Sequence, residues 1–154
     1  MVNPDFKKIK ESRFEKYFYE SFIETLKRYP NHQQSFKLWQ EGMERRIFYP
    51  QFHGREHLNV DQWMKGLKEG DKMLLKAFEH EMISISSIPS KMRFGYMEAL
   101  DFYDLDEKHN KELIIKDGLH LFEQRFGFKS STFIANCYIW HKDFEKTLYE
   151  RGVS

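Results

Sequence analysis

The chain has 154 residues, a length typical of one domain that buries a hydrophobic core without help from disulfide bonds. Its 25 Lys and Arg nearly balance its 24 Asp and Glu, which argues against the basic surface of a nucleic-acid-binding protein. A single cysteine, Cys137, with no apolar run of signal-peptide or membrane-spanning length, predicts a cytoplasmic protein without disulfides.

The first half of the chain predicts helices around one short strand. Apolar and aromatic residues recur at helical spacing over residues 31–46, which predicts a helix with one buried face. The apolar run at residues 47–52 predicts a strand that ends just before His53. Residues 58–68 predict a second helix, which Gly70 ends.

The second half repeats this alternation. Residues 82–86 alternate with the period of a strand, and residues 107–126 have the spacing of a helix. A buried strand at residues 132–135, a loop at 136–140 and a helix at 142–151 follow. No linker interrupts the chain, so we predict one α/β domain, a parallel sheet or barrel, whose functional groups lie on loops after strands.

The segment most typical of chemistry is His53-Gly54-Arg55-Glu56-His57. Two histidines four positions apart on a helical turn can reach one divalent metal, which then needs a third ligand. Gly54 permits a close backbone approach, and the planar fork of Arg55 suits a carboxylate, either Glu56 or a substrate acid. The plain alternative is a pair of surface histidines beside a turn and a surface salt bridge.

The same five residues also fit H-x-x-E-H, a zinc-protease signature in which Glu56 would be the general base. That chemistry requires a regular helix and a later acidic ligand, for which Glu123 and Glu145 are the candidates. Pro50 and Gly54 disfavour such a helix, so we rank the metalloprotease below the other interpretations.

Aromatic side chains supply the remaining candidates. Tyr138 and Trp140 follow a predicted strand and are candidates for substrate binding. Trp39 and Trp63 have helical spacing relative to other apolar residues, which predicts that both belong to the core. No basic partner for Cys137 is visible in the sequence, which favours a buried, inert thiol.

Two stretches of the chain resemble one enzyme family. The run YPQFHGREHLNV at residues 49–60, followed by Trp63, is similar to the histidine motif of the polysaccharide-deacetylase-like family of the NodB type. The runs GLHLFEQRFG at 118–127 and STFIANCYIW at 131–140, and a helix that ends in ERGV, resemble the surroundings of that family's third motif. The similarity covers most of the chain from residue 31 onward.

The resemblance implies a distorted (β/α) barrel in which an Asp and two His hold a divalent metal, usually zinc. The metal activates water to hydrolyse N- or O-acetyl groups on a glycan. His53 and His57 would be the two imidazole ligands, and an acetylated glycan or glycan precursor would be the substrate.

The chain also departs from the family. Nothing before residue 31 matches the early motif with its metal-binding and catalytic Asp, and the late motif with a Leu and a His is missing. We therefore expect residues 1–154 to be an incomplete barrel, truncated at both ends, that lacks the base and is inactive alone. The alternative is a non-catalytic carbohydrate-binding or scaffold domain.

Overall fold

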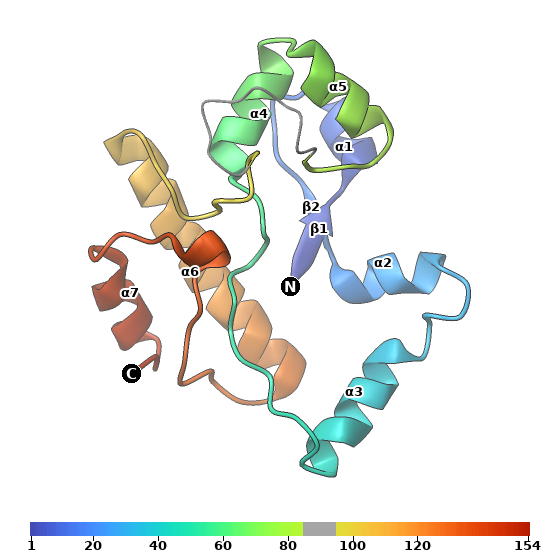
Figure 1. Cartoon of the computed structure of the whole chain (residues 1–154), viewed down its shortest axis with the longest axis vertical. Helices are drawn as coiled ribbons and strands as arrows, with labels where there is room; N and C mark the ends of the chain where they lie inside the picture. The colour runs from blue at the N-terminus through green and yellow to red at the C-terminus, as the bar shows by residue number, and fades with distance from the viewer. Residues whose placement is uncertain (85–94) are drawn as a thin grey trace.

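The structure is a computed structural model that describes residues 1–84 and 95–154 (Figure 1). Its elements, in chain order, are β1 (Val2–Pro4), α1 (Phe6–Glu11), β2 (Tyr19–Ser21), α2 (Phe22–Arg28), α3 (Ser35–Glu44), α4 (Val60–Lys68), α5 (Lys72–Glu79), α6 (Leu105–Phe126), a 3-10 turn (Asn136–Tyr138) and α7 (Phe144–Glu150). No helix in these ranges is both long enough and apolar enough to cross a membrane.

The predicted α/β barrel is wrong. In the described part of the chain, the only paired strands are the short antiparallel β1 and β2, with Val2 opposite Ser21, and the rest of the regular structure is helical. The predicted strands at 47–52 and 132–135 contribute a single isolated parallel bridge, between Phe52 and Phe133.

The predicted strands failed for physical reasons. Ile47 and Tyr49 are 72% and 65% exposed, so the apolar run at 47–52 does not lie in the core. The backbone N–H of Phe52 donates to the side-chain hydroxyl of Ser130 at 3.0 Å, where a sheet would supply a neighbouring carbonyl. Of the predicted strand at 82–86, residues 82–84 form no strand and the other two lie outside the described residues.

The predicted helices are confirmed within a few residues at each end. The longest, α6, begins at the N-cap Asp104, whose side chain accepts from the backbone N–H of Glu107 at 2.8 Å. It ends at Gly127, whose φ of 79° is the left-handed conformation that glycine adopts without strain. This helix runs along the middle of the molecule, with α7 on one flank (Figure 1).

The core has two separate clusters of buried side chains. One joins α1, α4 and α5 and includes Ile9, Trp63, Leu67, Leu74 and Phe78. The other joins α6 and α7 and includes Phe52, Ile115, Leu119, Phe122, Phe144 and Leu148. Trp63 is fully buried, as predicted, whereas Trp39 is 43% exposed, so its assignment to the core is wrong.

The segment between Phe52 and Val60 connects these two clusters. Phe52 is fully buried in the cluster of α6 and α7, and Leu58 is 1% exposed in the cluster of α1, α4 and α5. The backbone between them pairs with the N-terminus, where the N–H of Val2 donates to the carbonyl of Arg55 at 3.0 Å. The His53–His57 motif is therefore anchored at both ends by buried apolar side chains.

Candidate metal centre

His53 lies on an irregular turn and its ring is fixed by a backbone group. Its Nδ1 is 2.7 Å from the carbonyl oxygen of Ile134, and because a carbonyl only accepts, Nδ1 carries the proton. The side-chain amide of Asn136 donates to the carbonyl of His53 at 2.9 Å, which holds the backbone at this point. The exposed ring therefore presents Nε2 with a free lone pair, the form that binds a metal.

The second histidine lies against the first. The ring centroids of His53 and His57 are 5.4 Å apart at an interplanar angle of 60°. The His57 Nδ1 is buried and makes no hydrogen bond within the described parts of the chain, although the carbonyl of Met97 is close enough to influence the ring. Both imidazoles thus have a backbone carbonyl on one side and the other histidine nearby.

Burial is the main reason why the pKa of His57 lies below its ordinary value, and the proximity of His53 lowers it further. The carbonyls of His57 itself and of Met97 oppose this shift and are the weaker influence. The neutral ring is the form that coordinates a metal, so burial favours the binding-competent state at neutral pH.

The four-residue spacing predicted that the two histidines are neighbours, but the helical turn assumed for them is wrong. Residues 53–57 are not helical, and α4 begins only at Val60. The chain instead turns at Gly54, whose φ is 98°, and this turn brings His57 back beside His53. A Cβ on Gly54 would lie 2.7 Å from Oδ1 of Asn136, so the close approach predicted for this glycine is present.

Arg55 and Glu56 face away from solvent and form a buried ion pair. Nε and Nη2 of Arg55 donate to the two carboxylate oxygens of Glu56 at 2.7 and 2.9 Å, and Nη1 donates to Asp117 at 2.9 Å. The Tyr19 ring lies 4.6 Å from the guanidinium carbon and its hydroxyl donates to Asp117. All of these donors already have carboxylate partners, which leaves them less available to a substrate acid. The predicted role of Arg55 in substrate binding stays a prediction.

The same pairing weakens the protease alternative. Burial raises the pKa of Glu56, and the guanidinium of Arg55 opposes that rise. The carboxylate has 2% of its side chain exposed and both oxygens bonded to Arg55. A general base must reach a substrate proton, and Glu56 lacks both that access and the helical setting of the signature.

The loop after Ala135 places its aromatic side chains in solvent. Tyr138 is 83% exposed and Trp140 is 52% exposed, which suits the predicted contact with a substrate. Cys137 and Tyr138 both have positive φ, 54° and 56°, a conformation that is unusual for residues other than glycine. The Cys137 thiol donates weakly to the Met97 carbonyl at 3.4 Å, and burial raises its pKa, which agrees with an unreactive thiol.

The residues present fit part of a metal site. The two imidazoles supply two ligands. The proton of His53 is fixed on Nδ1 by the Ile134 carbonyl, whereas the buried Nδ1 of His57 has no hydrogen-bond partner in the described chain. Across residues 1–84 and 95–154, no group of three or more His, Cys, Asp or Glu side chains is arranged to hold a metal ion. Glu123 lines a different hollow, with His120 and Glu150.

Sequence reasoning missed the groups that orient the histidines. The sequence pattern predicts only a loop position for Asn136, and it predicts no role for Ile134 or Met97 at the histidine pair. The contributions of Ile134 and Met97 are backbone carbonyls, which leave no signal in residue type. Asn136 had one available signal, a polar residue directly after an apolar run that follows the pattern of a strand.

The lowered pKa of His57 predicts a measurable titration. Followed by the ring-proton NMR shifts, His57 should titrate below pH 6.5 in the folded protein and near that value in urea. His53→Ala should raise the pKa of His57, because it removes the electrostatic influence by which His53 lowers that pKa. Since the folded pKa is depressed, this histidine's contribution to stability should be present above pH 6.5 and lost as the pH falls through the folded pKa. An unchanged pKa in the variant would contradict the pairing.

Comparison of the chain with protein-family models, with curated proteins and with solved structures found no match.

Proposed function

We propose that His53 and His57 hold a divalent metal, zinc in the first instance, as the histidine part of a centre that deacetylates glycans. The observation that supports this most directly is the pairing of the two rings at 5.4 Å with the proton of His53 fixed on Nδ1. This arrangement leaves His53 Nε2 directed outward. A hydrogen bond from the other ring nitrogen to a backbone carbonyl, as Nδ1 makes here, is typical of histidines that bind metals. Deacetylation is proposed as the reaction because residues 49–60 resemble the deacetylase motif.

The chain's own residues would divide the work as follows. A bound metal polarises an acyl carbonyl and lowers the pKa of water, which is the chemistry that deacetylation requires. His53 and His57 would bind it, and the exposed rings of Tyr138 and Trp140 would stack on the sugar. A general base is still needed, and Glu56 is held by Arg55, so we expect metal binding without turnover by this chain alone.

Zinc titration by calorimetry tests the metal site. We expect one zinc per chain, and a loss of affinity of at least about tenfold in His53→Ala and in His57→Ala. The matched control is His109→Ala, on the exposed surface of α6, which should leave zinc affinity unchanged. Equal zinc binding by all four proteins would contradict the proposed site.

Glycan binding tests the second part of the proposal. With zinc present, an N-acetylated chito-oligosaccharide should quench the tryptophan fluorescence at lower concentration than the deacetylated oligosaccharide. Trp140→Phe should remove this change, and Trp39→Phe should retain it, because Trp39 lies on α3, outside the loop that carries Tyr138 and Trp140. Equal titration by both sugars, or retention of the signal in Trp140→Phe, would overturn the glycan part.

Catalysis is tested by supplying the missing base. Zinc-loaded protein should release no acetate beyond zinc in buffer, whereas added formate, a small carboxylate, should give release that His53→Ala abolishes. If the oligosaccharide binds but formate produces no release, the non-catalytic carbohydrate-binding domain is the correct function.

A further inference from the structure

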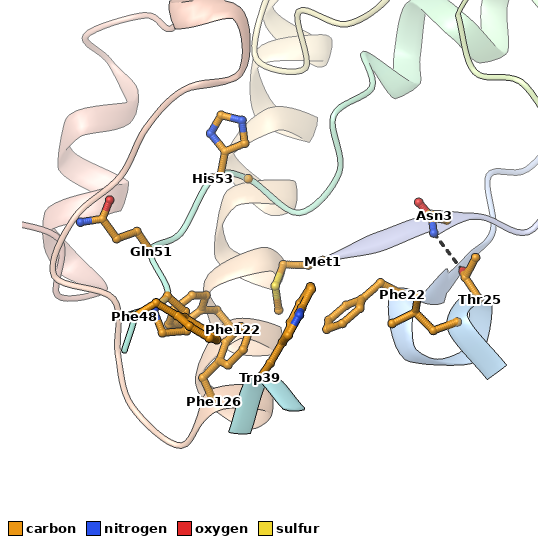
Figure 2. Close-up of a pocket in the computed structure, with 13 residues that line it drawn as sticks. Met1, Asn3, Phe22, Thr25, Trp39, Phe48, Gln51, His53, Phe122 and Phe126 are labelled. Carbon is orange, nitrogen blue, oxygen red and sulfur yellow. Dashed lines mark hydrogen bonds between the residues drawn. The ribbon is translucent and has the colours of Figure 1, made fainter. Parts of the chain in front are cut away.

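A second site lies on the other side of the segment that carries the histidines. A cavity of about 620 Å³ opens between α2, α3, α6 and residues 48–54. Figure 2 shows the ring of His53 pointing away from the aromatic side chains of this cavity. The side chains that form most of the wall are Phe22, Leu26, Trp39, Phe48, Phe122 and Phe126.

Charged side chains are missing from the described wall of the cavity. None of its side chains belongs to Asp, Glu, Lys or Arg, and burial lowers the pKa of the Met1 amino group. The polar side chains of Asn3 and Thr25 have protein partners: the Asn3 amide donates to the Thr25 hydroxyl at 2.9 Å (Figure 2), and that hydroxyl donates to Glu20 at 2.8 Å. A charged ligand would lose its hydration here without gaining a partner of opposite charge.

The aromatic rings are held in place by one another. Phe22 and Trp39 are stacked, with centroids 5.4 Å apart and an interplanar angle of 26°, and Phe36 packs edge-on against Phe22 at 5.7 Å. On the opposite wall, the centroids of Phe122 and Phe126 are 4.8 Å apart. The cavity is therefore formed before any ligand binds, which limits the entropic cost of binding.

Part of this apolar wall still faces water. Trp39 is 43% exposed and Phe48 is 41% exposed, although both belong to the cavity. Burial of such surface favours binding, and a flat aromatic ligand gains most from offset stacking on indole and phenyl rings. The volume also lies within the range of about 300–1,000 Å³ that is typical of small-molecule sites.

We propose that this cavity is a binding site for a small, uncharged molecule that contains aromatic rings. The cavity adjoins the metal centre, because His53 and Gly54 line it, but its aromatic wall comes from residues outside the His53–His57 segment. Neutral ligands bind in preference to anions of the same shape, since no Lys or Arg lines the described wall and burial lowers the pKa of the Met1 amino group, which disfavours its charged form.

Fluorescence of N-phenyl-1-naphthylamine, an uncharged aromatic probe, tests the proposal in the full chain. We expect saturable binding with one probe per chain, and a loss of affinity of at least tenfold in Trp39→Ala. The matched control is Trp140→Ala, which removes an exposed tryptophan outside the cavity and should leave probe affinity unchanged. Circular dichroism of both variants checks that the helices are retained.

Two further measurements make the test independent of Trp39. Leu26→Trp, which fills the cavity from α2, should also weaken probe binding by at least tenfold. In competition, 2-naphthalenemethanol should displace the probe at a concentration at least tenfold lower than 2-naphthoate.

Three results would overturn the proposal. One is unchanged probe affinity in both Trp39→Ala and Leu26→Trp. Another is equal displacement by the neutral and the anionic naphthalene. The third is a wild-type chain that is dimeric, binds no probe and becomes monomeric in Trp39→Ala, which would show that a second copy covers this face.

Discussion

Arg55→Ala is expected to lower the free energy of unfolding by about 3–5 kcal/mol, because it leaves a buried carboxylate without its partner. The side chains of Arg55 and Glu56 are only 10% and 2% exposed, and two hydrogen bonds join them. Urea denaturation followed by far-ultraviolet circular dichroism measures the change. A loss of this size is a large part of the total stability of a domain.

The control for this prediction is Arg28→Ala. Arg28 also pairs with a carboxylate, that of Glu20, but its own side chain is 54% exposed, so the loss should be about 1 kcal/mol or less. If the two arginine variants lose the same stability, burial is not the reason for the effect.

The pH dependence of Arg55→Ala gives an independent check. Burial raises the pKa of Glu56, and removal of the guanidinium takes away the main influence that opposes this rise. A carboxyl with a raised folded pKa is more favourable to stability at low pH, and the benefit disappears as the pH rises through the folded pKa. The deficit of the variant relative to wild type should therefore shrink as the pH approaches 4.5, the ordinary value for Glu.

Local signals predicted α3, α4, α6 and α7, but they predicted neither α1, α2 and α5 nor the assembly of the helices. The α6 helix was predicted from the spacing of its apolar residues and from Gly127, both of which act within a few residues of chain. The strand at 47–52 was predicted from apolar composition alone, yet only Phe52 of that run is fully buried. Composition cannot tell a strand from an irregular segment that anchors one side chain, because no ladder is needed to bury Phe52.

At the candidate site too, the sequence predicted the local features but not the long-range contacts. The two histidines were identified from spacing, and the structure brings their rings together through the turn at Gly54. The carbonyl that orients His53 comes from Ile134, and the carbonyl of Met97 influences the pKa of His57. These residues lie about 40 to 80 positions farther along the chain, so only the folded structure reveals them. Trp39 was misplaced because helical spacing locates an apolar face without showing what covers it.

Gly54→Ala tests whether the turn itself creates the histidine pair. The alanine must adopt the φ of 98° that Gly54 has, and its methyl group would lie 2.7 Å from Oδ1 of Asn136. Backbone strain and displacement of a buried side chain together should cost about 2–5 kcal/mol of unfolding free energy. Asn136 holds the carbonyl of His53, so its displacement should also move His53 and weaken zinc binding, by up to the loss expected for His53→Ala.

Gly70→Ala separates these two causes. Gly70 also has a positive φ, 80°, but no atom lies within 4 Å of the position of an added Cβ. That variant should therefore lose only about 1–2 kcal/mol and should bind zinc like the wild type. The difference between the two variants then measures the contact between Gly54 and Asn136. If Gly54→Ala kept wild-type zinc affinity, rotation of the histidine side chains would be enough to bring the two rings together. The turn at Gly54 would then have only a structural role.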